Sequence, residues 1–106
     1  MMQGLLRVSS EREIELLVDE YEGLKFKLTD GVDVADDGTI YFTDASHKYP
    51  VKDAVLDILE GKPNGRFFSY NPATKKTTLL AKDLYFANGV AVSADQQFVV
   101  FCESVL

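Results

Sequence analysis

The amino-acid sequence predicts an all-β fold built from a repeated unit of paired strands. Asp30-Gly31-Val32 returns later in the chain as Asn88-Gly89-Val90, and in both places an alternating strand, a tight turn and a second apolar strand follow. Internal repetition over a few tens of residues is typical of repeat architectures such as propellers. Five Tyr and seven Phe, with no Trp, suit a protein rich in strands.

Alternating and β-branched runs locate the strands, and Gly, Pro and Asp mark the turns between them. The strands are expected at residues 4–8, 13–19, 31–35, 39–44, 65–71 and 77–81, and again in the second copy of the repeat from Asn88 onward. Asp36-Asp37-Gly38 is a hairpin turn, because Asp-Gly supplies the positive φ angles that such turns require. Residues 21–27 are interpreted as a linker.

One segment has a different character and predicts a short inserted helix at residues 50–60. Its apolar residues Val51, Val55, Ile58 and Leu59 follow helical spacing, Pro50 suits the first turn and Gly61 suits the end. This helix either packs its apolar face on neighbouring strands or, with Tyr49, forms a lid over a site.

The repeat extends to the remaining strands. Residues 4–8 with 15–18 match residues 66–70 with 77–80, so each unit reads as hairpin, linker and hairpin. Four antiparallel strands make one blade of a β-propeller. We expect one partial propeller domain over residues 1–106, with about two blades in units of approximately 4–46 and 65–104.

A closed propeller needs roughly four to eight blades, so this chain is expected to be a fragment of a longer protein. The chain begins and ends in mid-blade, and open strand edges invite aggregation. We therefore expect the fragment alone to be inactive and prone to aggregate.

Composition excludes several classes of function. The formal net charge is -6 with no basic stripe, so no nucleic-acid partner is expected. No stretch approaches the ~18 apolar residues of a membrane span, and residues 1–7 do not form a signal peptide. Cys102, the one cysteine, lies in an apolar run and is expected to be buried.

Four long motifs resemble plant strictosidine synthase-like proteins. They occur in the same order and spacing as in that family, at residues 26–46, 56–66, 69–78 and 83–95. The resemblance covers residues 4–104 and extends to adipocyte plasma membrane-associated proteins, paraoxonases and gluconolactonases. It implies a six-bladed propeller with an active-site mouth on the central axis.

The resemblance also implies candidate site residues. In the calcium-dependent hydrolases of this group, an Asn that opens the innermost strand points at an axial calcium. Asn88 matches that motif, and Asp30 holds the equivalent place with a carboxylate instead of an amide. Calcium prefers such oxygen ligands, although Asp and Asn are also common before Gly in turns.

Further polar residues stand near these two. Asp44 and Glu103 end equivalent strands and either support the axial site or are solvated strand-end charges. His47 either lines the pocket mouth or lies on a surface loop. A triad of Asp44, Ser46 and His47 is not expected, because neighbours along a strand point to opposite faces.

Three functions remain open for a protein that acts on or binds a small molecule. The first is an esterase or lactonase with an axial calcium held in part by Asp30 and Asn88. The second is a metal-free condensation of an amine with an aldehyde, as in strictosidine synthase, whose catalytic Glu lies in a later blade outside this chain. The third is a non-enzymatic binding propeller. The resemblance implies a location in the secretory pathway, vacuole or endomembrane system.

Overall fold

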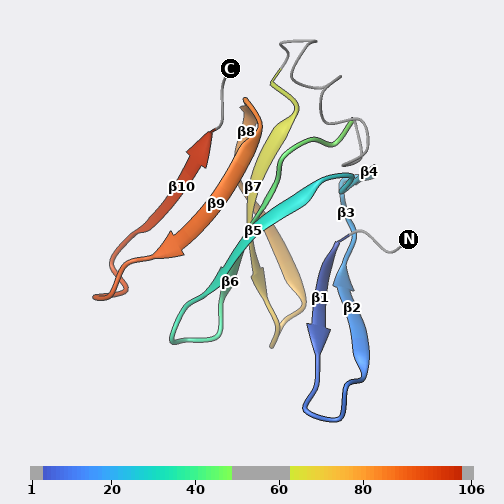
Figure 1. Cartoon of the computed structure of the whole chain (residues 1–106), viewed down its shortest axis with the longest axis vertical. Coiled ribbons are helices and arrows are strands. Elements are labelled where there is room, and N and C mark those ends of the chain that lie inside the picture. The colour runs from blue at the N-terminus through green and yellow to red at the C-terminus, as the bar shows by residue number, and fades with distance from the viewer. Residues whose placement is uncertain (1–3, 49–62, 104–106) are drawn as a thin grey trace.

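The computed structural model describes residues 4–48 and 63–103, and these form strands and turns (Figure 1). The predicted all-β fold is confirmed, with antiparallel sheets as in a propeller fragment. The predicted helix at 50–60 and Tyr49 lie outside the described residues. Within the described ranges, no helix has the length and apolarity needed to cross a membrane.

Ten strands are observed in the described residues. They are β1 (Leu5–Val8), β2 (Ile14–Val18), β3 (Glu20–Tyr21), β4 (Leu24–Lys25), β5 (Thr29–Val34), β6 (Ile40–Asp44), β7 (Gly65–Asn71), β8 (Lys76–Leu84), β9 (Ala87–Val92) and β10 (Val99–Glu103).

The central feature is a four-stranded antiparallel sheet in the order β5-β6-β7-β8. A sheet whose strands follow chain order has the topology of one propeller blade. The pair β1-β2 lies on one side of this sheet and the pair β9-β10 on the other, as Figure 1 shows. Hydrogen bonding therefore joins the second hairpin of the first repeat unit to the first hairpin of the next.

The predicted linker at 21–27 is partly wrong, because it contains the second half of a small hairpin. Tyr21 pairs with Leu24 across a two-residue turn. Glu22 and Gly23 in that turn have φ angles of 50° and 82°. Positive φ at both central residues is the geometry that matches the twist of paired strands.

The repeat is exact enough to preserve irregularities in strand pairing. In β1-β2 the register shifts between Leu5 and Leu6, and in β7-β8 it shifts between Phe67 and Phe68. These are equivalent places in the two copies. The chain thus comprises the outer half of one blade, a complete blade and the inner half of a third.

An aromatic core joins the first half-blade to the complete blade. Its buried members are Leu5, Phe26, Phe42, Phe68 and Tyr70. The ring centroids of Phe26 and Phe68 lie 5.0 Å apart, and those of Phe42 and Phe68 lie 5.2 Å apart. Buried aromatic pairs of this kind dominate the apolar area of a small core.

The other face of the complete blade contacts the third blade. Phe67, next to Phe68 on β7 but on the opposite face, stacks on Phe101 of β10 with centroids 4.6 Å apart. The complete blade is therefore held on both sides by its neighbours.

The expected burial of Cys102 is wrong, because this residue is exposed. Cys102 lies on β10, and among the described residues β10 pairs with β9 alone. Burial of a strand residue depends on what packs over it, and within residues 4–48 and 63–103 nothing packs over Cys102 closely enough to bury it.

Candidate functional site

Asp30 and Asn88 occupy the same kind of irregularity in two neighbouring inner strands. In β5, Thr29 pairs with Asp44 and Val32 with Phe42, so two residues, Asp30 and Gly31, stand opposite one. Such β-bulges bend a strand and re-aim its side chains, and they are common beside active sites.

The bulge recurs in β9. Ala87 pairs with Glu103 and Val90 with Phe101, so Asn88 and Gly89 together stand opposite one residue. The two copies of the repeat therefore share the bulged backbone geometry as well as the Asp-Gly and Asn-Gly sequence.

Thr43 joins the two bulges directly. Its Oγ1 accepts a hydrogen bond from the Gly31 amide at 3.0 Å and donates one to the Asn88 carbonyl at 2.8 Å. The residue has no exposed surface. A β-carbon added at Gly31 would lie 2.8 Å from the Asn88 carbonyl oxygen, so only glycine permits this approach. The two inner strands are thereby held side by side at their bulges.

The two predicted ligands differ in their surroundings. Asp30 is exposed, and within the described residues its carboxylate makes no hydrogen bond or ion pair. It borders a cleft of about 200 Å³ between the beginning of β5 and residues Leu5 and Leu6 of β1. Asn88 is half-buried. The structure therefore brings their strands together and leaves the Asp30 oxygens available.

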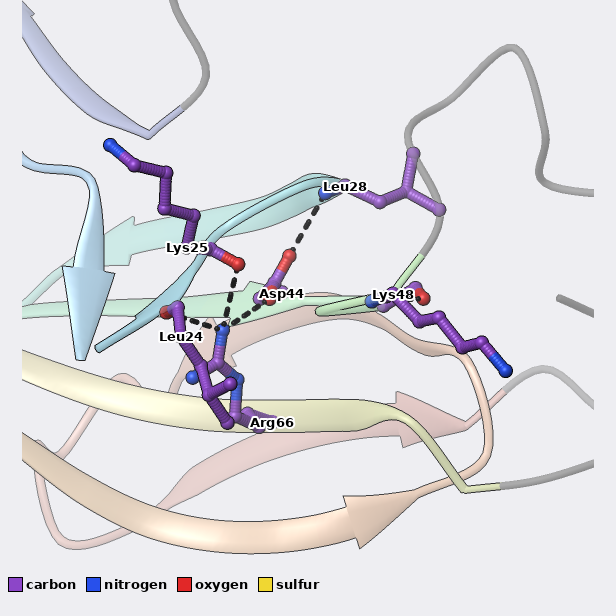
Figure 2. A network of polar contacts seen from close by, with 7 residues as sticks. Leu24, Lys25, Leu28, Asp44, Lys48 and Arg66 are labelled. Atoms are coloured by element: carbon purple, nitrogen blue, oxygen red, sulfur yellow. Dashed lines mark hydrogen bonds and ion pairs between the residues drawn. The ribbon is translucent and has the colours of Figure 1, made fainter. Parts of the chain in front are cut away.

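Asp44 is buried and not a solvated strand-end charge. Its Oδ2 accepts a hydrogen bond from Arg66 Nη2 at 2.8 Å, and its Oδ1 accepts one from the Leu28 amide at 3.0 Å (Figure 2). The same Nη2 of Arg66 reaches the carbonyl oxygens of Leu24 and Lys25, each at 3.3 Å. This buried pair ties β6 and β7 to the segment that leads into β5.

Aromatic rings surround the Arg66 guanidinium, whose carbon lies 5.2 Å from the Phe26 centroid and 5.1 Å from that of Phe68. Arg66 Nε is buried and has no hydrogen-bond partner among the described residues. Burial raises the pKa of Asp44 from 3.8 to about 6, even though the bonds from Arg66 and Leu28 act in the opposite direction. Desolvation is therefore the largest influence on this carboxyl group.

Glu103 holds the segment before β9, much as Asp44 holds the segment before β5. Its Oε1 accepts a hydrogen bond from the Tyr85 amide at 2.8 Å, just before the inner strand begins. Asp44 holds the Leu28 amide in a similar way, one residue nearer to its inner strand. Both carboxylates thus position the segments that enter the bulges.

His47 borders a second cleft, of about 290 Å³, together with Arg66, Tyr21 and Leu79. The His47 amide donates to the Asn64 carbonyl at 3.0 Å, which places the histidine next to the beginning of β7. Ser46 is buried, and its Oγ accepts a hydrogen bond from the Lys48 amide at 3.1 Å.

Sequence reasoning missed Thr43 and Arg66. Thr43 looks like an ordinary strand residue, and only the bulge places its hydroxyl between two backbones. The sequence did contain a signal for Arg66. Asp44, a carboxylate, ends one apolar strand, and Arg66, a cation, lies at the beginning of the next strand in the chain.

Oxygen donors are the chemistry that these residues offer to a metal. Within residues 4–48 and 63–103, no group of three or more His, Cys, Asp or Glu side chains lies close enough to hold an ion. A carboxylate from Asp30 and an amide oxygen from Asn88 fit calcium in type, but calcium takes six to eight ligands. Any such ion needs further ligands from other strands.

Comparison with known proteins identifies relatives along the whole chain. The family profile described as strictosidine synthase matches residues 30–106. Protein STRICTOSIDINE SYNTHASE-LIKE 7 of Arabidopsis thaliana is 55% identical over 103 residues, which are 96% of this chain and 28% of the relative. Protein STRICTOSIDINE SYNTHASE-LIKE 4 of the same plant is 53% identical over 105 residues, again 28% of its length.

A more distant relative comes from an animal. The adipocyte plasma membrane-associated protein of Rattus norvegicus is 34% identical over 109 residues, covering 98% of this chain and 29% of that protein. The chain therefore spans between a quarter and a third of the length of these relatives.

Proposed function

Because the chain belongs to the strictosidine synthase family, we propose that the full-length protein is a small-molecule hydrolase of the esterase or lactonase type. A calcium ion on the propeller axis is part of this proposal. One observation supports it: adjacent inner strands carry matching bulges that begin with Asp30 and Asn88, two oxygen-bearing side chains.

In this proposal Asp30 and Asn88 are two of the calcium ligands, and inner strands of other blades supply the rest. The bound ion would supply Lewis-acid polarisation of an ester or lactone carbonyl. The chain's own contribution is positional. Thr43 sets the spacing of the two bulges, and Asp44 and Glu103 hold the segments that enter them.

The test is calcium titration of the full-length protein, followed by calorimetry and thermal unfolding. We expect a rise in melting temperature and calcium-dependent hydrolysis of aryl esters or lactones. Asp30→Ala and Asn88→Ala are each expected to weaken calcium binding tenfold or more.

Asp36→Ala and Asn71→Ala are the matched controls, since Asp36 lies in an exposed turn and Asn71 is the exposed last residue of β7, both away from the bulges. Calcium binding that is absent, or that is equally strong in Asn88→Ala, contradicts the proposal.

A second candidate is the metal-free condensation of an amine with an aldehyde, which the description of the matching family favours. Its catalytic Glu is expected beyond this chain. Product formation from tryptamine and secologanin in the presence of a chelator would establish this reaction in place of hydrolysis. A full-length protein with neither activity that still binds small molecules would favour a binding propeller.

We also propose a location in the secretory pathway, vacuole or endomembrane system, on the basis of the family. A fluorescent fusion of the full-length protein in plant cells tests it. Diffuse cytosolic fluorescence contradicts it.

A further inference from the structure

The cleft of about 290 Å³ beside His47 lies between the small hairpin β3-β4, the first residues of β7 and the strand β8. Its volume is close to the lower limit of roughly 300 Å³ that is usual for small-molecule sites. The walls come from segments in the interior of the sequence, and the residues that line them include Tyr21, Leu24, His47, Arg66, Leu79 and Lys82.

Arg66 is the buried charge in the wall of this cleft, with a side chain that is 5% exposed. Its Nη2 donates to Asp44 and to two backbone carbonyls, as Figure 2 shows. Within residues 4–48 and 63–103, Nη2 is the one guanidinium nitrogen with hydrogen bonds, and Nε is buried without a partner. Buried polar groups in native structures almost always have a partner. The unused donors of Arg66 therefore mark a place for the acceptor atoms of a ligand.

The other charges of the cleft are exposed. Lys82, Glu22 and Asp83 also line it, and all three are exposed to solvent. Water and salt screen exposed charges much more than buried ones. The buried guanidinium therefore dominates the inner end of the cleft, and hydrogen bonds from a guanidinium to a carboxylate are among the strongest in proteins.

The remaining walls are apolar. Tyr21, Leu24 and Leu79 line the cleft, and Leu24 is 49% exposed. The ring of Tyr21 packs on that of Phe68 with centroids 5.3 Å apart, which fixes its position. Small-molecule sites combine apolar walls with a few polar groups that set the orientation of the ligand. This cleft therefore suits a molecule with an apolar body and one strong acceptor group.

We propose that the cleft binds a small organic acid, whose carboxylate accepts hydrogen bonds from the unused guanidinium donors of Arg66 and whose apolar body lies against Tyr21 and Leu24. A carboxylate offers two acceptor oxygens and a single charge, which suits one guanidinium whose third nitrogen is already paired. The proposal does not depend on calcium or on hydrolysis, because Asp30 and Asn88 do not line this cleft.

Binding is expected to strengthen the junction between the hairpin and the complete blade. Arg66 already donates to the carbonyl oxygens of Leu24 and Lys25. An acid bound between Leu24 and Arg66 contacts both sides of this junction. A ligand that binds the folded protein alone raises its melting temperature.

The test is calorimetric titration of the full-length protein with phenylacetate and hexanoate, with and without added calcium. Phenylacetamide is the neutral probe of nearly the same shape as phenylacetate, and inorganic phosphate is the anion without an apolar body. We expect phenylacetate to bind at least tenfold more tightly than phenylacetamide, in either calcium condition, and to raise the melting temperature. Phosphate is expected to bind more weakly than phenylacetate.

Two variants locate the binding. Arg66→Lys keeps a cation beside Asp44 but lacks the planar fork of donors, so it is expected to weaken phenylacetate binding tenfold or more. Leu24→Trp fills the cleft from its exposed rim and is expected to do the same. Leu80→Trp, at a similarly exposed leucine outside the cleft, is the matched control and should bind as the unmodified protein does. Circular dichroism checks that each variant is folded.

Equal binding of phenylacetate and phenylacetamide overturns the proposal, and so does tighter binding of phosphate. Phenylacetate binding that is unchanged in both Arg66→Lys and Leu24→Trp also overturns it, because the acid then binds elsewhere in the protein. The same holds if neither phenylacetate nor hexanoate binds at millimolar concentration. None of these outcomes bears on calcium binding at Asp30 and Asn88, which is measured separately.

Discussion

Replacement of Arg66 by Met tests whether the buried ion pair holds the blade together. The change removes the guanidinium but keeps an unbranched apolar side chain between Phe26 and Phe68. Asp44 then remains buried, with the Leu28 amide still donating to its Oδ1 but without the guanidinium shown in Figure 2. Breaking a buried pair by removing one member leaves an uncompensated charge.

The magnitude follows from the contacts that are lost. An uncompensated buried carboxylate costs about 3–5 kcal/mol. The two ring contacts of the guanidinium add about 0.5–1 kcal/mol each. We therefore expect Arg66→Met to lower the free energy of unfolding by about 4–7 kcal/mol at pH 7, a large share of the 5–15 kcal/mol that is typical of a domain.

The assay is urea unfolding, followed by far-ultraviolet circular dichroism and tyrosine fluorescence, between pH 4 and pH 7. Arg66 lowers the pKa of Asp44, so its removal raises that pKa further above 3.8. The folded variant then binds a proton more readily than the unfolded chain, and its stability falls as the pH rises from 4 toward 7. The loss caused by Arg66→Met is therefore expected to shrink toward pH 4.

Two further variants complete the experiment. Asp44→Asn combined with Arg66→Met keeps an acceptor for the Leu28 amide and removes the charge, so it should recover most of the loss. Arg7→Met removes the exposed ion pair with Glu15 and should cost about 1 kcal/mol or less. A loss below about 1 kcal/mol for Arg66→Met, or a loss that is independent of pH, would refute the reasoning.

Three more predictions concern the bulges and the acid titration. Thr43→Val keeps the shape but leaves the Gly31 amide and Asn88 carbonyl without their partner, so it should cost about 2–4 kcal/mol in urea unfolding. Thr43→Ser should cost less, and the reverse order would show that the methyl group matters more than the hydroxyl. Gly31→Ala should lower the free energy of unfolding by about 2 kcal/mol or more, because the new β-carbon would lie 2.8 Å from the Asn88 carbonyl oxygen. A neutral result would mean that β9 can move away. The pKa of Asp44 near 6 exceeds the ordinary 3.8, so this group should make the protein less stable as the pH rises through that window, a trend that Asp44→Asn should abolish in the same titration.

Strand positions and turns were predictable because they depend on local chemistry. The alternation in residues 31–35 and the Asp-Gly turn that follows correspond to β5, β6 and their hairpin. The small hairpin β3-β4 was missed, because its turn uses Glu22 at a positive φ, which Glu seldom adopts.

The bulges at Asp30 and Asn88 could not be read from the sequence. A bulge is a difference in count between two paired strands, so it exists only once the partner strand and its register are known. The same holds for Thr43, whose two hydrogen bonds reach β5 and β9.

The sequence by itself determined the repeat, the all-β class and the equivalence of Asp30 with Asn88 and of Asp44 with Glu103, because strand periodicity and turn residues are encoded locally. The tertiary structure decided what those equivalent residues do. Asp44 is buried against Arg66, while Glu103 is exposed, and Thr43 is covered, while Cys102 is not. The physical reason is that a residue is buried or paired only when another surface packs against it. In a repeat protein that surface comes from the neighbouring unit.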